Sequence, residues 1–369
     1  MNLTIAKEQL INGLQAVQNV VSVRTTLPIL SNVLIRAEKD RVELTATDLD
    51  VTISCTVEGS VKKAGAATVP VKKLFGIVRE LNNPEIEIEV DEKNTCSVRC
   101  GASFYKINGL AAEEFPPLPK FKEEKKVTLP QEKIRGMMKK TSFAISTDES
   151  RYVLNGIFIS LKEHKMTMVA TDGRRLALVD EDVDVSEKSQ GEFIVPAKAV
   201  NELNRLLQDK GDVEIRYSDN QASFTLKDDK GSSVLVITKL IEGNYPNYRQ
   251  VIPGEAKERV ALAREEFCHA LKRAEIMTSE KSNSVKLAFT KNNLAITANS
   301  PEVGEARESL AINYKGKEMA IAFNPKYMIE PLNALTNEEV FLELIDELSP
   351  GVLKINGPFL YVVMPMRLS

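Results

Sequence analysis

The sequence predicts an α+β protein built from three tandem copies of one domain, each with two helices packed on antiparallel sheets. One turn motif occurs three times after a strand-like run, as Thr47-Asp48-Leu49-Asp50, Thr171-Asp172-Gly173-Arg174 and Ala298-Asn299-Ser300-Pro301. Further along each copy a proline opens a helix, at Pro70, Pro196 and Pro325. Equivalent positions are 124 to 129 residues apart, which is the size of a domain and far longer than a solenoid repeat.

Each copy is expected to begin with a short strand and a helix, and these helices span residues 7–19, 131–140 and 264–275. In the first helix, Leu10, Leu14 and Val17 recur at spacings of three or four residues and form one apolar stripe. Pro130 stands near the first turn of the second helix, where its missing N–H removes no helical hydrogen bond.

Alternating apolar residues predict strands before the turn motif at 29–35, 152–159 and 282–289, and after it at 50–57, 175–182 and 304–312. The second helices are expected at 72–81, 198–210 and 326–335. The apolar runs are interrupted at Asn32 and at Asn155 or Gly156, which favours a bulge or a close approach of two backbones at these positions. Hairpin-type turns between the strands make each copy an α+β unit.

Two segments that combine proline with turn residues separate the copies, at 112–120 and 243–254. We therefore expect three domains that comprise residues 1–121, 122–253 and 254–369.

The net charge of -3 and the pI near 5.8 argue against a simple electrostatic DNA-binding protein. The charge is unevenly distributed, however, because the six expected helices together carry +6 and the remainder carries -9. This asymmetry indicates either a basic helical face or only the preference of lysine and arginine for helices, and composition leaves both readings open.

The composition is that of a cytoplasmic protein. No apolar run approaches the roughly 18–20 residues that a membrane span needs. The segment from Met1 to Lys7 lacks the features of an export signal. The four cysteines form no framework of pairs, so we expect free thiols in a reducing compartment.

The sequence predicts no catalysis, cofactor or metal. It contains no glycine-rich dinucleotide fingerprint, no phosphate-binding lysine loop and no nucleophile elbow. Cys96 and Cys100 lie far in sequence from both histidines, so strand thiols are expected there rather than a closed zinc site. Because Asn299 replaces the aspartate of the motif in the third copy, Asp48 and Asp172 are interpreted as turn caps rather than acid–base groups.

Three segments carry a family resemblance: Leu27 to Val33, Val169 to Leu176 and Tyr361 to Leu368. With the three copies and the linkers, they resemble the bacterial DNA sliding clamp family, the beta subunit of DNA polymerase III, from Met1 to Leu368. Two departures from the family pattern are Gln250, where some members have arginine, and Ser369, which extends past the usual terminal leucine.

The resemblance implies a head-to-tail homodimeric ring that encircles duplex DNA without sequence preference and acts as a non-catalytic processivity factor. Its implied partners are the replicative DNA polymerase, the clamp loader, repair polymerases and mismatch-repair proteins, with no membrane partner. A ring retains DNA by topology, so weak phosphate binding suffices and strong binding would slow sliding.

The resemblance also implies functional residues in three sets. The groove for partner peptides is expected to comprise Leu154, Thr171, Gly173, Arg174, Arg175, Leu176, Pro246, Val251, Val362, Met364, Pro365, Met366, Arg367 and Leu368. The DNA contacts carried over from the family are Arg24, Arg151 and Tyr152. Helix charge adds Lys72, Lys73, Arg79, Lys133, Arg135, Lys139, Lys140, Lys198 and Arg205. The ring contacts are expected at Tyr105, Ile107, Ile276 and Met277.

Structural readings of the same residues remain open at this point. The Met-Pro-Met tail is also compatible with an edge strand that finishes the last sheet, the basic residues with a solvated face, and the interface residues with a core. Two other functions also remain open: a tandem interaction scaffold that does not encircle DNA, and an enzyme with a metal at Asp48 or Asp172.

Overall fold

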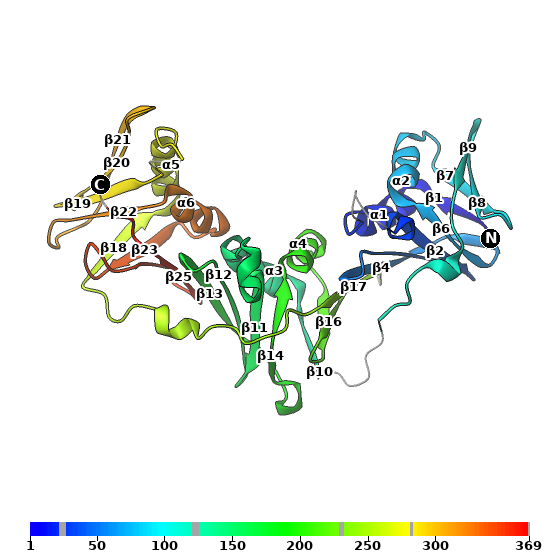
Figure 1. Ribbon diagram of the computed structural model, residues 1–369, viewed down its shortest axis with the longest axis horizontal. Coiled ribbons are helices and arrows are strands. Elements are labelled where there is room, and N and C mark those ends of the chain that lie inside the picture. The colour runs from blue at the N-terminus through cyan, green and yellow to red at the C-terminus, as the bar shows by residue number, and fades with distance from the viewer. Residues whose placement is uncertain (22–26, 120–124, 229–231, 281–282, 368–369) are drawn as a thin grey trace. The chain divides into compact units, whose positions relative to one another are not determined.

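The computed structural model describes residues 1–21, 27–119, 125–228, 232–280 and 283–367, and its chain divides into two compact units (Figure 1). Unit 1 contains Met1–Arg135 and Lys198–Leu240, and unit 2 contains Gly136–Ala197 and Ile241–Ser369. The second sequence copy therefore contributes strands to both units. No helix in the described ranges is long and apolar enough to cross a membrane.

Unit 1 holds two antiparallel sheets. The first has the strand order β5 (Ser60–Lys63), β1 (Asn2–Ala6), β7 (Glu85–Val90), β8 (Thr95–Cys100) and β9 (Ser103–Asn108). The second has the order β10 (Lys125–Pro130), β15 (Asp212–Tyr217), β16 (Gln221–Lys227), β17 (Ser233–Lys239), β4 (Val51–Glu58), β3 (Arg41–Thr47), β2 (Asn32–Glu38) and β6 (Gly65–Pro70). The second sheet joins two sequence copies, because β4 of the first pairs with β17 of the second.

Unit 2 repeats this arrangement between the second and third copies. Its larger sheet has the order β14 (Gly191–Pro196), β11 (Gly156–Lys162), β12 (Lys165–Thr171), β13 (Arg175–Asp182), β25 (Phe359–Val363), β24 (Gly351–Lys354), β23 (Glu339–Leu344) and β18 (Glu258–Ala263). Its smaller sheet has the order β21 (Gly304–Ala311), β20 (Asn293–Ser300), β19 (Val285–Thr290) and β22 (Met319–Phe323). Pairing of β13 with β25 joins the two copies.

The helices lie where the periodicity predicts them, with ends shifted by up to four residues. They are α1 (Lys7–Val17), α2 (Val71–Glu80), α3 (Gln131–Thr141), α4 (Ala197–Leu206), α5 (Arg264–Glu275) and α6 (Pro325–Ala334). Leu10, Leu14 and Val17 are buried, which confirms the predicted stripe of α1. With the observed bounds, these six helices again carry a formal charge of +6.

Helix α4 ends at Leu206 rather than at the predicted residue 210. Just beyond the last turn of the helix, the amide of Gln208 donates to Oε1 of the Gln131 side chain at 3.0 Å rather than to a helical carbonyl. Gly211 follows with a φ of +82° and reverses the chain.

The strands before the turn motif begin later than predicted. Short 3₁₀ turns occupy their expected first residues, η1 at Pro28–Ser31 and η4 at Glu149–Leu154. Proline at the first position of η1 and a side-chain cap from Asp148 on η4 favour these turns. The third of these strands, β19, begins at Val285 rather than at residue 282.

The turn motif is a side-chain cap in the first two copies. Oδ1 of Asp48 accepts hydrogen bonds from the amides of Asp50 and Val51, and Oδ1 of Asp172 accepts them from the amides of Arg174 and Arg175. The predicted equivalence of Asn299 is wrong, because Asn299 lies inside β20 and pairs with Glu305 of β21. The third copy extends this hairpin, and its turn follows Ser300.

The predicted close approach of two backbones is found at Gly156. A Cβ at this position would lie 2.3 Å from the carbonyl oxygen of Val195 on the neighbouring strand β14. A side chain therefore fits only if the ladder between β11 and β14 shifts.

We expect Gly156→Ala to destabilise the protein by about 1–3 kcal/mol, as overpacking of a close contact usually does. Gly136→Ala is the matched control, because a Cβ there meets nothing within 4 Å and alanine favours the surrounding helix. Thermal and urea unfolding of both variants measure the difference. A Gly156→Ala variant as stable as the Gly136→Ala control would contradict the close approach.

Candidate functional site

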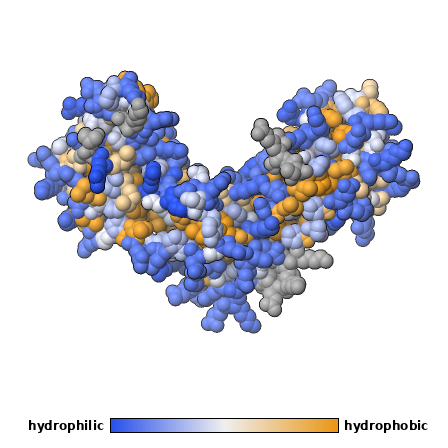
Figure 2. Space-filling view, viewed as in Figure 1, coloured by the Kyte–Doolittle hydropathy of each residue, from blue (hydrophilic) through white to orange (hydrophobic). Residues whose placement is uncertain are grey.

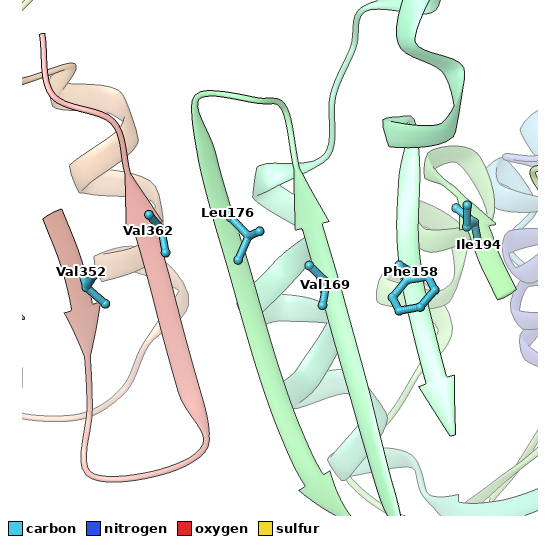
Figure 3. Packing of buried hydrophobic residues seen from close by; sticks show 6 residues of the cluster. All are labelled: Phe158, Val169, Leu176, Ile194, Val352 and Val362. Carbon is cyan, nitrogen blue, oxygen red and sulfur yellow. The ribbon is translucent and has the colours of Figure 1, made fainter. Parts of the chain in front are cut away.

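An apolar row crosses one face of the larger sheet of unit 2. It consists of Ile194, Phe158, Val169, Leu176, Val362 and Val352, one from each of six neighbouring strands (Figure 3). The strand register explains the two halves of the row, because Phe158 faces both Ile194 and Val169, and Val362 faces both Leu176 and Val352. The halves meet on β13, where Val169 faces Leu178, two residues beyond Leu176 on the same face of the strand. The row crosses from the second copy into the third at the pair Leu176 and Val362.

The segment after β17 covers part of this row. The ring of Tyr245 stacks on Phe158 with centroids 5.0 Å apart and planes 18° apart, and Tyr248 meets the same ring at 6.0 Å. The amide of Ile241 donates to the carbonyl of Ile194 at 3.0 Å and ties the start of the segment to β14. Burial raises the pKa of the Tyr245 hydroxyl, against the opposing effect of the Thr171 backbone.

The predicted groove residues include both buried and exposed apolar side chains. Leu154, Leu176 and Val362 are buried, whereas Val251, Met364 and Met366 are 55%, 47% and 38% exposed. We call these six residues the apolar site. Figure 2 shows a face that is mostly hydrophilic, with hydrophobic side chains gathered in smaller patches. Large exposed apolar side chains that lie together mark interaction surfaces more often than isolated ones do.

The tail after β25 is held by its main chain. The amide of Met364 donates to the carbonyl of Arg174 at 2.9 Å, and the amide of Met366 donates to the carbonyl of Ala322 in β22 at 2.7 Å. Strand β25 lies inside the larger sheet between β13 and β24, whereas the tail beyond it forms a single antiparallel bridge on β22, the outer strand of the smaller sheet. The side chains of both methionines are therefore exposed, whereas their main chain is held by hydrogen bonds.

The turn beside the tail has a defined shape. Oγ1 of Thr171 donates to the carbonyl of Arg175 at 2.6 Å and accepts from the amide of Gly173 at 3.1 Å. Gly173 has a φ of +84°, and a Cβ there would lie 2.6 Å from Nη1 of Arg151. Glycine therefore lets Arg151 pass close to the backbone of the turn.

Two of the predicted groove residues differ sharply in accessibility. Arg174 is exposed at the turn, but the side chain of Arg175 is only 6% exposed. Its guanidinium pairs with Asp172 and Glu330 and lies 4.4 Å from the centre of the Tyr327 ring. Arg175 thus presents little surface to a ligand.

The other predicted groove residues flank the same region. Pro246 and Arg367 are exposed, and Pro365 is partly exposed between the two methionines of the tail. Leu368, like Arg24 of the DNA set, lies outside the described residues.

Two apolar side chains near the tail escaped the sequence prediction. Leu348, at 83% exposure, belongs to a turn capped by Asp346 and placed beside β22 by a contact between Glu347 and the amide of Ala320. The hydrogen bonds from Ser349 and Leu348 hold the pKa of Asp346 below its usual range. In the sequence, the leucine that follows Asp346 in a turn capped by this aspartate was the signal that could have indicated an exposed apolar side chain. Tyr327, which is half-buried in α6 beside the guanidinium of Arg175, gave no such signal.

Many of the predicted DNA contacts already have partners within the chain. Lys198 pairs with Asp48, Arg135 with Asp209, Arg151 with Asp148, and Arg79 with Glu80. Lys72, Lys73, Lys139, Lys140 and Tyr152 are exposed or half-exposed, and Lys133, which also interacts within the chain, is half-buried.

Arg205 has a structural role in unit 1. It donates to the carbonyls of Gln15 and Ala16 at 3.0 and 2.6 Å, near the C-terminal end of α1, and pairs with Glu202. A cation at this end of a helix satisfies carbonyls that have no helical partner.

The predicted ring contacts lie at two sheet margins. Tyr105 and Ile107 belong to β9, which is an edge strand in unit 1, with Tyr105 exposed and Ile107 buried. Phe104 on the same strand is also exposed and was missed by the prediction. In unit 2, Ile276 is exposed directly after α5, and the side chain of Met277 approaches Gly304 at the start of the edge strand β21.

The thiols are structural. Cys96 and Cys100 are buried and free on β8, and burial raises the pKa of Cys96 to about 12. Such a thiol stays protonated near neutral pH and is a poor metal ligand.

Comparisons with known proteins agree over the full chain. Family models match residues 1–119, 128–247 and 249–367, and describe the N-terminal, central and C-terminal domains of the DNA polymerase III beta subunit. The beta sliding clamp of Chlamydia muridarum is 36% identical over 368 residues, which cover 100% of this chain and 99% of the relative.

Solved structures show the same similarity. A sliding clamp from Bartonella birtlesii bound to griselimycin matches with a TM-score of 0.94 and 35% identity. The DNA polymerase III subunit beta of Pseudomonas aeruginosa matches with a TM-score of 0.93 and 34% identity. Both matches cover all of each chain.

We expect Tyr245→Ala to loosen the segment of residues 241–252 without unfolding the sheet below it. The substitution removes the stacked ring on Phe158, which contributes about 0.5–1.5 kcal/mol beyond its buried area. Hydrogen exchange of the backbone amides measures the loosening. Tyr105→Ala, which removes an exposed ring from β9 in unit 1, is the control and should leave these amides unchanged. Equal exchange in the two variants would show that the stack does not hold the segment.

Proposed function

The chain belongs to the DNA polymerase III beta subunit family, and we propose that it is a sliding clamp that encircles duplex DNA and tethers the replicative polymerase. It is a non-catalytic processivity factor, whose role is to keep the polymerase on its template. The uneven charge is the observation that carries this proposal: helices with +6 stand against a remainder with -9. A ring retains DNA by closure, so a modest number of phosphate contacts leaves it free to slide.

The proposed ring is a head-to-tail homodimer in the cytoplasm, with the three domains 1–121, 122–253 and 254–369 in each subunit. Two sheet edges support this assembly, β9 in unit 1 and β21 in unit 2. Exposed edge strands pair readily with other chains, and a heterologous contact closes into a ring when the rotation permits. Lys106 on β9 and Glu305 on β21 supply opposite charges to the two edges.

The proposed ligand of the apolar site is a short apolar segment of a partner protein. The exposed methionines support this, because flexible thioether side chains adapt to different ligands. A single site of this kind serves several partners in turn: the polymerase, the clamp loader, repair polymerases and mismatch-repair proteins. Griselimycin, which is bound in the clamp from Bartonella birtlesii, is a practical small probe for it.

We expect the protein, once loaded by its clamp loader, to remain on closed circular duplex DNA and to leave when a restriction enzyme linearises the circle. Gel filtration of the DNA fraction measures retention, since only topological binding depends on closure. The native mass should be twice the 41.0 kDa of the chain. Equal retention on circular and linear DNA would rule out encirclement, and a monomeric mass would favour a tandem scaffold.

We expect the double substitution Met364→Ala and Met366→Ala to weaken polymerase binding by about 10- to 100-fold, because both side chains present exposed apolar surface. Titration calorimetry measures the affinity, and native mass shows that the dimer persists. Leu49→Ala removes an exposed apolar side chain from the equivalent turn of the first copy and is the control. Unchanged polymerase affinity in the double variant would place the partner site elsewhere.

A further inference from the structure

The guanidinium of Arg175 joins three separate segments of unit 2. Its Nε lies 3.1 Å from Oδ2 of Asp172 in the turn, and its Nη2 donates to the carbonyl of Phe143 at 2.6 Å. Its Nη1 pairs with Glu330 of α6. The guanidinium also lies near the aromatic rings of Phe143 and Tyr327, 5.7 and 4.4 Å from their centres. A planar group with five donors suits such a junction, whereas an ammonium does not.

The segments that Arg175 joins also hold the tail of the apolar site. The turn supplies the carbonyl of Arg174, which accepts the amide of Met364. Helix α6 follows β22, whose Ala322 accepts the amide of Met366. The hydroxyl of Tyr361 in β25 donates to the carbonyl of Tyr327 at 2.7 Å. The two main-chain attachments of the tail therefore depend on the turn and on the neighbourhood of α6, which Arg175 links.

Unit 1 offers an internal comparison. At its junction, where the first copy pairs with the second, the same turn, helix and strand meet without an arginine at the position of Arg175. Lys198 stands two residues after Pro196, as Tyr327 stands two after Pro325, and it reaches Asp48 directly. The amide of Lys239 donates to Asp50 as that of Met364 donates to Arg174.

The two junctions differ where Arg175 stands. Val51 takes the place of Arg175, and Lys239, which pairs with Asp50, takes the place of Met364. Both junctions thus contain an ion pair that links the turn to the helix. The buried arginine is found at the one that carries the apolar site.

We propose that Arg175, with Glu330 as its counter-charge, is a positioning residue for the apolar site. It sets the turn of residues 171–174 relative to α6, and thereby fixes where Met364 and Met366 present their side chains. The inference deepens the proposed peptide site and rests on it for its functional consequence. The structural consequence, a tail held by two attachments, follows from the contacts alone.

The test compares Glu330→Gln with Asp48→Asn in the full-length protein. Glu330→Gln removes the counter-charge and retains the shape, whereas Asp48→Asn weakens the equivalent tie in unit 1. We expect Glu330→Gln to lower the affinity for griselimycin about tenfold and to speed amide exchange at Met364 and Met366. Asp48→Asn should change thermal stability but neither readout. Arg175→Lys, which keeps the charge and loses the planar fork, should behave as Glu330→Gln does.

The possible results separate the positioning role from the proposed function. Normal affinity and normal exchange in both Glu330→Gln and Arg175→Lys would overturn the positioning role. Equal loss in Asp48→Asn would also overturn it, because the effect would then be one of general stability. If the unmodified protein binds neither griselimycin nor the polymerase, the proposed function fails. Amide exchange at Met364 and Met366 then still decides the role of Arg175.

Discussion

Main-chain pairing between neighbouring sequence copies is the interaction on which the rest of this structure depends. The ladder of β4 with β17 completes one eight-stranded sheet, and the ladder of β13 with β25 completes the other. Each ladder satisfies backbone groups that would otherwise form an open sheet edge. It also places side chains from distant parts of the chain next to each other. Leu176 meets Val362 only because β13 and β25 pair, so the apolar site belongs to neither copy alone.

The two ladders show how one scaffold gives two different surfaces. In the first, Thr52 faces Ile237, and Lys239 forms an ion pair with Asp50 at the end of the ladder. In the second, Leu176 faces Val362, and Met364 follows in the position of Lys239. An exposed ion pair remains hydrated and contributes little to adhesion, whereas an exposed thioether gains free energy when a partner covers it. A few differences at equivalent positions therefore give the second junction the exposed apolar surface on which the proposed peptide binding rests.

Local features of the chain were predictable, and contacts between distant segments were not. The helix stripe of Leu10 and the turn cap of Asp172 depend on residues a few positions away, and both are visible in the sequence. The pairing of β4 with β17 depends on register between segments about 180 residues apart. The buried state of Arg175 depends on Glu330, 155 residues away. A basic residue after a polar turn predicts a surface position, and only the tertiary fold supplies the aromatic rings and carboxylates that bury it.

The intramolecular partners of the basic residues bear on how such a protein holds DNA. Arg205 caps α1, Lys198 ties a turn to α4, and Arg135 pairs with Asp209, so part of the positive helix charge stabilises the fold. Each phosphate contact adds about 0.9 to the dependence of log affinity on log salt, and a protein that binds through many of them dissociates and moves slowly at low salt. A ring has no need of that affinity. Closure by topology therefore permits the same side chains to serve the structure, and it explains how a chain with a net charge of -3 can retain a polyanion.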